Sequence, residues 1–375
     1  MVLRRIACLL VPELPLAALL RTHPELEGTA FAVATAPGSR AEILAASPQA
    51  RRQGVHPFQT AAQARAACAE IVIREVSEAA SRAAGEALLD AALSTSPRAV
   101  SGPPRSGLYA AEAVVFVDAE GCNTLFRSER GLAGALAERA RKLGIPAVVA
   151  VASSRTVAHL AARELGRGVS GNTLVIPDGE DAAYVAPLPF DLLDLDDELS
   201  DRLTRFGLRR LGDLARLPER EIATRLGADA TALLDLAHGR TSGTRPPLAQ
   251  PTAFEESSEL EVAIDRLEPL TFVLRGMLSR LTSRLRCRQL ACGNLDLELR
   301  LEGGTRESRR VGVSAATLDL RVLLGLVTLS LDSHPPRAPL AVVAPRTEGR
   351  AERRDHLDRL PPAGPAPRVL TQTVA

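Results

Sequence analysis

The sequence contains a single lysine, no tryptophan and few aromatic residues, and these absences limit the sites that it can build. Lys142 is the only lysine among 375 residues, and aromatic residues make up 3% of the chain. A Walker-type phosphate loop needs a glycine-lysine pair, so that class of nucleotide-binding site is excluded. All other cationic residues are arginines, which indicates a GC-rich coding bias more than a functional choice.

Cysteine and histidine are too few and too scattered to predict a metal centre. The cysteines are odd in number and show no Cys-x-x-Cys spacing, so neither a disulfide framework nor a zinc site is expected. The six histidines, His159 and His238 among them, show no metal-ligand spacing. We therefore predict no metal site and treat most cysteines as small buried hydrophobes. The five cysteines are Cys8, Cys68, Cys122, Cys287 and Cys292.

Long apolar runs are also missing, although 46% of the residues are hydrophobic. No uninterrupted run approaches the ~18 residues of a membrane span, and the N-terminus lacks a signal-peptide cleavage pattern. We expect a soluble, cytoplasmic protein with no membrane partner. Its length allows two to four packed domains.

The charge is almost balanced, with 46 basic and 45 acidic residues and a net charge of +1. This balance is unexpected for a nucleic-acid-binding protein, because neutralising phosphates provides much of the affinity. The charge is nevertheless uneven. No acidic residue occurs between Pro269 and Leu295, and acidic residues gather at 191–201. The arginines of the basic region are candidates for DNA contact or a plain solvated face, whereas the acidic stretch is interpreted as surface. These arginines are Arg275, Arg280, Arg284, Arg286 and Arg288.

The hydrophobic periodicity predicts an α+β, multidomain protein. In residues 1–185, strand-like runs alternate with helical stretches, a pattern typical of a mixed sheet backed by helices. Residues 186–240 are wholly helical, and residues 241–255 have the Pro, Gly and Ser content of a linker. The predicted strands of the first region are 6–11, 30–34, 113–119 and 147–152, and its main helices are 75–93, 125–143 and 153–165.

Residues 256–345 have the order strand, helix, two strands, helix, strand. The alternation in residues 295–301, LDLELRL, is the clearest signal of a half-buried strand. Residues 346–375 are rich in Pro, Arg and Gly without a hydrophobic period, and we expect a disordered tail. The predicted elements are strand 257–264, helix 267–285, strands 294–301 and 306–313, helix 318–331 and strand 339–344.

Two apolar segments, residues 6–17 and 111–118, resemble the metal-binding strands of a polymerase palm. In Y-family (translesion) DNA polymerases the first strand ends in Asp-x-Asp, and the second reads Ser-x-Asp-Glu-x-x-x-Asp. Those carboxylates hold two divalent ions roughly 3.5 to 4 Å apart, and valine or alanine cannot replace them. We therefore predict no catalytic residues. The resemblance places Val11 and Glu13 at the first pair and Ala113 and Val114 at the second, and it retains Asp118.

Further motifs resemble the Y-family nucleotide pocket in a degenerate form. Residues 47–55, SPQARRQGV, resemble the fingers helix, and Arg51 matches an arginine that holds the incoming triphosphate. Residues 147–162 resemble a strand-then-helix element in which Ser153 is kept and Arg155 replaces a lysine. The triphosphate-binding lysine expected near Val169 is absent. The resemblance therefore implies that Arg51, Ser153 and Arg155 are relics of this pocket.

The resemblance spans roughly residues 4 to 345, with the ImuB group of Y-family-like proteins as the nearest group. It implies a UmuC-like palm and fingers region (1–185), a helical thumb (186–240) and a βαββαβ little-finger domain (256–345). The little finger lies along DNA, so eight of its arginines are predicted phosphate ligands. The acidic entry to this domain, residues 255–259, predicts weaker or repositioned DNA contact. The eight are Arg280, Arg284, Arg286, Arg288, Arg300, Arg306, Arg309 and Arg310.

The ImuB group is regarded as a set of non-catalytic partners in a damage-induced (SOS) mutagenesis complex. The resemblance implies a DNA repair protein that binds primer-template or damaged DNA and scaffolds an error-prone translesion complex. Its implied partners are DNA, an error-prone C-family DNA polymerase and an ImuA-type accessory protein, with no cofactor. A sliding clamp is a possible partner, but the sequence contains no clamp-binding motif.

Two other interpretations stay open at the level of sequence. The first is an active translesion polymerase with rearranged Mg²⁺ ligands, namely Glu13 and Asp118 with Glu112. Glu112 is adjacent to Ala113 on a strand and should face the opposite way, which weakens this model. The second is an α/β protein with no nucleic-acid role, which the near-neutral charge permits.

Overall fold

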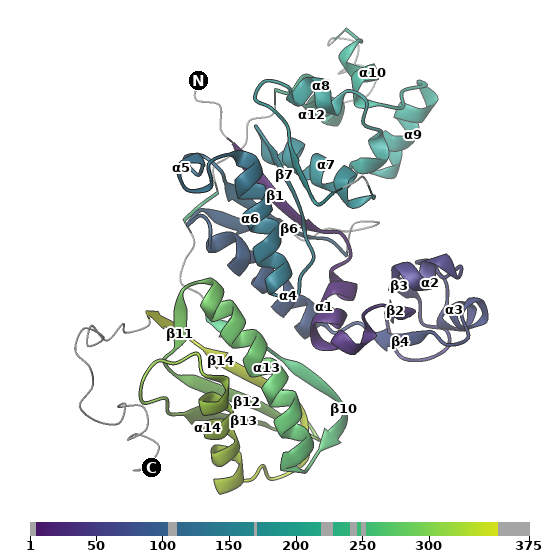
Figure 1. The fold of residues 1–375 in the computed structure, drawn as a ribbon. Coiled ribbons are helices and arrows are strands. Elements are labelled where there is room, and N and C mark those ends of the chain that lie inside the picture. Colours follow the sequence, from purple (N-terminus) through teal and green to yellow (C-terminus); the bar gives the residue numbers. More distant parts are fainter. Residues whose placement is uncertain are drawn as a thin grey trace. The chain divides into compact units, whose positions relative to one another are not determined.

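A computed structural model describes residues 5–103, 111–168, 171–218, 228–240, 246–248 and 253–351. The chain divides into two compact units, Met1–Gln250 and Pro251–Ala375 (Figure 1). The boundary between the units falls inside the predicted linker. The predicted tail beyond residue 351 lies outside the described residues.

The first unit is built on a five-stranded mixed sheet, as the strand pattern predicts (Figure 1). Its strands are β1 (Ile6–Val11), β5 (Ala99–Ser101), β6 (Ala113–Asp118), β7 (Val148–Ala152) and β8 (Thr173–Val175), and its helices are α4 (Glu78–Leu93), α5 (Asn123–Phe126), α6 (Glu129–Lys142) and α7 (Arg155–Gly166). The strand order is β5-β6-β1-β7-β8, and the central strand β1 is buried along its whole length. Ser77, Ser128 and Ser154 cap α4, α6 and α7 by accepting a backbone N–H.

A smaller three-stranded sheet forms the fingers-like part of this unit. Its elements are α1 (Leu14–Thr22), η1 (Pro24–Leu26), β2 (Phe31–Ala34), β3 (Ile43–Ala46), α2 (Pro48–Arg52), α3 (Ala61–Ala67) and β4 (Val72–Glu75). The strand order is β3-β2-β4, and Ser47 and Thr60 cap the two short helices. Leu16 and Leu19 of α1 pack against Phe31 and Val33, so α1 joins this sheet to the end of β1.

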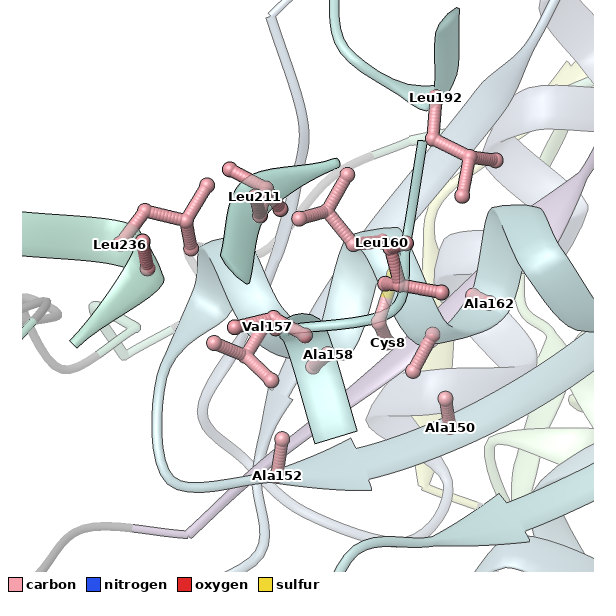
Figure 2. Packing of buried hydrophobic residues seen from close by; sticks show 14 of the residues in the cluster. Cys8, Ala150, Ala152, Val157, Ala158, Leu160, Ala162, Leu192, Leu211 and Leu236 are labelled. Atoms are coloured by element: carbon pink, nitrogen blue, oxygen red, sulfur yellow. The ribbon is translucent and has the colours of Figure 1, made fainter. Parts of the chain in front are cut away.

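Short helices follow, as the leucine spacing predicts for this region. They are α8 (Asp181–Val185), η3 (Phe190–Leu192), α9 (Asp197–Arg205), α10 (Leu211–Ala215) and α12 (Ala228–Ala237). Leu192, Leu211 and Leu236 share one hydrophobic core with Cys8 of β1 and Leu160 of α7 (Figure 2). The thumb-like helices and the palm-like sheet thus contribute to one hydrophobic core.

The second unit has the predicted βαββαβ order (Figure 1). Its elements are β9 (Phe254–Glu255), β10 (Ser258–Ile264), α13 (Leu267–Cys287), β11 (Leu290–Cys292), β12 (Leu295–Leu301), β13 (Arg306–Val311), α14 (Leu320–Ser333), β14 (Leu340–Thr347) and β15 (Gly349–Ala351). The main sheet has the order β10-β14-β12-β13, with β9 added to β14. The leucines of β12 pack with those of α13 and α14, so the helices cover one face of the sheet. We call the other face, which carries Asp296, Glu298 and Arg300, the open face.

Two predicted boundaries of this unit are wrong. Phe254 and Glu255, assigned to the linker, form β9 because they pair with Thr347 and Arg346. The predicted tail begins too early, because β14 continues to Thr347 and residues 349–351 form β15 against β11. These short edge pairings have no hydrophobic period of their own, so the pattern of the sequence does not reveal them.

Candidate functional site

The four degenerate palm positions lie where β1 ends beside the start of β6. Val11 lies directly opposite Ala113 in the antiparallel register, and Leu10 lies opposite Val114. Val11 is 2% exposed and Val114 is 7% exposed. Hydrocarbon side chains that exclude water therefore occupy the place where the sequence resemblance expects metal-binding carboxylates.

Glu13 follows β1 and is paired with the fingers arginine. Its carboxylate accepts a hydrogen bond from Nη2 of Arg51, and Nε of Arg51 donates to the carbonyl oxygen of Ala46 at 2.8 Å. The structure thus brings together two predicted site residues, Glu13 and Arg51, next to Val11. Their charges cancel, so the arginine predicted to hold a triphosphate already has an anionic partner.

The side chain of Glu112 points to the opposite face of the sheet from that of Ala113, as expected for neighbouring residues on a strand. Its carboxylate accepts from Nη2 of Arg163 at 2.9 Å and lies 3.4 Å from Nε2 of His159, and its side chain is 5% exposed. Burial acts to raise the pKa of Glu112, but its hydrogen bonds with His159 and Arg163 outweigh burial and lower the pKa. Because Nη1 of Arg163 also donates to the carbonyl oxygen of Leu192 at 2.7 Å, Glu112 belongs to a buried contact between palm and thumb.

Asp118 lies at the opposite end of the sheet from Glu13. It pairs with Ile6, at the start of β1, and its Oδ1 accepts the backbone N–H of Glu120 at 3.1 Å. The five-residue step from Ile6 to Val11 corresponds to about 17 Å of strand. The expectation that Glu13 and Asp118 bind one ion is therefore wrong, because carboxylates so far apart cannot share a metal.

Magnesium therefore does not fit the residues present at the palm. The described residues contain no group of three or more His, Cys, Asp and Glu side chains able to hold a metal ion. Mg²⁺ requires hard oxygen ligands in near-octahedral geometry, and the Val11–Ala113 pair supplies none. No catalytic step through a metal can be derived from this arrangement.

Ser153 and Arg155 do not share a pocket with Arg51. Ser153 follows β7 beside the start of β1, where its Oγ accepts from Nη1 of Arg5 at 3.1 Å and donates to Asp181 at 3.2 Å. The guanidinium of Arg155 lies over the ring of Phe116, 5.6 Å from its centroid, and burial lowers the pKa of Arg155. The prediction of a single nucleotide-pocket relic is thus wrong, because the antiparallel register puts its parts at opposite ends of β1.

Arg5 was not identified from the sequence, although its side chain is at the centre of the contacts around Ser153 near the start of β1. Its guanidinium makes a bidentate pair with Glu129, with both N–O distances at 2.6 Å, and Nη2 also donates to the carbonyl oxygen of Ile176. No motif marks Arg5, since its partners come from α6 and from the segment after β8. The cluster is a set of internal contacts that fix the start of β1.

Two of the eight predicted DNA ligands are internal. Arg284 is 2% exposed, and its Nη1 donates to Glu256 Oε1 at 3.1 Å and to the carbonyl oxygen of Glu255 at 2.7 Å. Nε of Arg280 donates to Oε2 of the same carboxylate at 3.1 Å. The prediction that Arg280 and Arg284 bind phosphates is wrong, because Glu256 holds both. The acidic segment 255–259, which contains Glu256, was interpreted only as a sign of weaker or repositioned DNA contact.

Three other predicted ligands lie on the open face of the second unit. Arg300 and Arg306 are cross-strand partners on β12 and β13, and Arg310 pairs with Asp296 at 2.8 Å. Arg300 lies 3.7 Å from Glu259. The open face therefore carries exposed arginines interspersed with carboxylates, which matches the near-zero net charge of the chain.

The remaining three predicted ligands lie elsewhere. Arg309 points to the helix-covered side, where it pairs with Glu307 at 2.8 Å and its side chain is 15% exposed. Arg286 is exposed on the last turn of α13, and Arg288 follows that helix. The eight predicted arginines thus occupy both faces of the unit and do not form a single track for phosphates.

Within the described parts of the chain, no helix is both long and apolar enough to cross a bilayer.

Comparisons with known proteins agree with this fold. The impB/mucB/samB family model matches residues 15–163. Protein ImuB of Caulobacter vibrioides (strain NA1000 / CB15N) is 31% identical over 296 residues, covering 77% of this chain and 60% of that protein. DNA polymerase IV of Halorhodospira halophila (strain DSM 244 / SL1) is 28% identical over 320 residues, covering 81% of this chain and 84% of the relative.

Solved structures show the same architecture. The crystal structure of DinB from Sulfolobus solfataricus matches with a TM-score of 0.52 at 14% identity, covering 92% of this chain and 99% of the other. An insertion ternary complex of Dbh DNA polymerase matches with a TM-score of 0.51 over the same shares of the two chains. The chain spans 60% of the length of the ImuB relatives that it matches. The chain thus contains a segment, residues 15–163, that is similar to the impB/mucB/samB family, and it has an ImuB protein among its relatives.

Proposed function

We propose that this chain is a non-catalytic, Y-family-like DNA repair protein. It binds primer-template or damaged DNA and scaffolds an error-prone translesion synthesis complex in the cytoplasm. The observation that carries the proposal is the pairing of Val11 with Ala113 where β1 ends and β6 begins. A pair of hydrocarbon side chains offers no ligand for the two ions that phosphoryl transfer on this fold requires.

The positions of the remaining carboxylates support the loss of catalysis. Glu13 is neutralised by Arg51, Glu112 is buried with Arg163, and Asp118 lies at the far end of β1. A rearranged metal site needs at least two of these groups within a few ångströms of one ion. The alternative of an active polymerase with rearranged ligands is therefore not favoured.

DNA binding in this proposal belongs to the open face of the second unit. Arg300 and Arg306 face each other across β12 and β13 and are exposed there. Arginines on a flat sheet can follow a phosphate backbone, and nearby carboxylates keep the affinity modest. We expect weak DNA binding that is independent of sequence and falls steeply with salt.

The partner proteins are inferred from the similarity to ImuB proteins and are part of the proposal. A chain that binds DNA without synthesis needs a polymerase, for which we propose an error-prone C-family enzyme and an ImuA-type accessory protein. A sliding clamp remains a candidate third partner.

Primer extension by the purified chain tests the proposal. The wild-type chain, with Mg²⁺ and then Mn²⁺, should extend no primer while still shifting labelled primer-template DNA in a gel. The matched variant Val11→Asp/Ala113→Asp/Val114→Glu restores the carboxylates that the resemblance expects. The glutamate variant Glu13→Ala serves as a control for rearranged ligands.

The results of primer extension and of the gel shift distinguish the three functional interpretations. Absence of extension with retained DNA binding supports a non-catalytic scaffold. Metal-dependent extension by the wild-type chain that is lost in Glu13→Ala would establish an active polymerase and overturn the proposal. A chain that neither extends primers nor binds DNA at low salt is the α/β protein without a nucleic-acid role.

A further inference from the structure

A groove of about 800 Å³ lies between α13 and α14 in the second unit. The two helices run side by side over the sheet (Figure 1). The residues that line the groove are distinct from the stripes that these helices bury against β12. The groove is therefore an outward-facing surface of the helices. It is lined by Leu267, Thr271, Arg275, Leu320, Arg321, Leu324, Gly325, Thr328, Leu329 and Asp332.

The floor of the groove is apolar and partly exposed. Four leucines contribute to it, and one of them, Leu329, is 58% exposed. On the neighbouring turn of α13, Phe272 is 80% exposed. A contiguous apolar surface with polar flanks is typical of a protein-binding site, because leaving it in water is unfavourable.

A glycine keeps the centre of this groove open. Gly325 is exposed in the interior of α14, where glycine is unfavourable. A Cβ atom added there meets no atom within 4 Å, so packing inside the unit does not require glycine. The missing side chain deepens the groove at the middle of the helix.

Two arginines flank the apolar floor without an internal counter-ion. Arg275 and Arg321 are exposed on α13 and α14, and among the described residues neither has a carboxylate within 4.0 Å. By contrast, Arg280, Arg284 and Arg310 are all paired with carboxylates. The only acidic residue in the lining is Asp332, at the end of α14.

We propose that this groove docks a short amphipathic helix of a partner protein, with a leucine-type stripe on one side and acidic residues on its flanks. The lining of α14 from Leu320 to Asp332 spans about 18 Å, the length of a roughly 12-residue helix. The apolar stripe covers the leucines, and the acidic flanks meet Arg275 and Arg321. A DNA backbone would satisfy the arginines but leave the leucines in water. The inference goes beyond the proposed function, because neither DNA binding nor loss of the metal site requires it.

Fluorescence anisotropy with defined peptides tests the groove in the chain of residues 1–375. The probe is a labelled, helix-forming peptide of about 14 residues with leucines at positions i, i+3, i+4 and i+7 and glutamates on both flanks. The comparison peptide has lysine in place of each glutamate. We expect the acidic peptide to bind at least ~10-fold tighter than the basic one, with an affinity that decreases as salt increases.

Variants locate the binding site. Gly325→Phe fills the groove and should weaken acidic-peptide binding by at least ~10-fold, a loss of the size seen at interface hot spots. The matched control Gly134→Phe also places a phenylalanine at an exposed helical glycine with no atom within 4 Å of the new Cβ, but in α6. Arg275→Ala/Arg321→Ala should remove most of the salt dependence. Thermal melting of each variant shows that it is folded.

The proposal fails if the acidic peptide does not bind, if the basic peptide binds equally well, or if Gly325→Phe and Gly134→Phe behave alike. It also fails if unlabelled duplex DNA displaces the peptide and binding of that DNA is itself lost in Gly325→Phe. In that case the groove is a nucleic-acid site. DNA binding that is unaffected by Gly325→Phe keeps this test separate from that of the proposed function.

Discussion

The site where β1 ends beside the start of β6 differs from the open face of the second unit in how its charged side chains are arranged. At the first place, the buried Val11 pairs with Ala113, and the carboxylate of Glu13 is bound to Arg51. At the second place, Arg300 and Arg306 are exposed on a half-buried sheet. Both regions belong to a fold shared with Y-family polymerases. The function that we propose assigns DNA contact to the second region and no chemistry to the first.

The largest expected effect comes from returning a single carboxylate to the palm. Val11→Asp should lower the free energy of unfolding by about 4 kcal/mol at pH 7, since a fully buried carboxyl group has its pKa raised by about 3 units and each unit costs 1.36 kcal/mol. Urea denaturation measures the change. The isosteric neutral variant Val11→Asn should lose less, and the penalty of Val11→Asp should shrink as pH falls. A Val11→Asp chain as stable as the wild type would show that water or a cation reaches this site.

The next effect tests which arginines of the second unit are structural. Arg284→Ala removes one of the two guanidinium groups, those of Arg280 and Arg284, that pair with Glu256. Removing one partner of a buried pair costs about 3 kcal/mol or more. Guanidinium denaturation should show a loss of stability, whereas the exposed control Arg286→Ala should leave the midpoint unchanged. If Arg284→Ala weakens DNA binding without destabilising the unit, the assignment of Arg284 to the interior is wrong.

A third, smaller effect compares the two sides of the second unit directly. Arg300→Ala/Arg306→Ala removes two cations from the open face, and Arg275→Ala/Arg321→Ala removes two from the helix-bearing side. The first pair should reduce the log-log slope of DNA affinity against salt by about 1.8, since each phosphate contact contributes about 0.9. The second pair should leave that slope unchanged. Equal slopes in the two variants would remove the open face from the DNA-binding model.

The smallest effect is a pH dependence at the contact between palm and thumb. The pKa of Glu112 is lowered from its ordinary value of 4.5 in the folded chain. A carboxyl group with a lowered folded-state pKa stabilises the fold above its unfolded pKa, and that contribution is lost as pH falls through the folded-state pKa. The stability difference between wild type and Glu112→Gln should therefore be present at pH 7 and disappear below the folded-state pKa. Urea midpoints from pH 7 to pH 3 measure it, and a constant difference would contradict the assignment.

The sequence predicted the order of elements well, because strands such as residues 6–11 and 294–301 have a clear period and length. The first has the bounds of β1, and the second begins one residue before β12. The apolar palm positions were also predictable, since Val11 and Ala113 occur at motif positions. The resemblance did not show that Asp118 and Glu13 lie at opposite ends of β1, because this depends on the register of β6.

The arginines were harder to assign than the strands. Arg280 and Arg284 were predicted as phosphate ligands from their spacing on one helix, but Glu256, more than twenty residues earlier, binds both. A charge pattern along the chain does not show which acidic residue from another element will meet it. The groove between α13 and α14 likewise could not be predicted from the sequence, because it depends on how two helices far apart in sequence pack together.

Manganese binding tests the loss of the metal site most directly. Free Mn²⁺ is measured by electron paramagnetic resonance while the wild-type chain is added to primer-template DNA and a non-hydrolysable nucleotide. We predict no stoichiometric uptake of Mn²⁺ by the wild-type chain beyond that of DNA and nucleotide alone, and uptake of about two ions per chain by the folded Val11→Asp/Ala113→Asp/Val114→Glu variant. Stoichiometric uptake by the wild-type chain that disappears in Glu13→Ala would contradict this account.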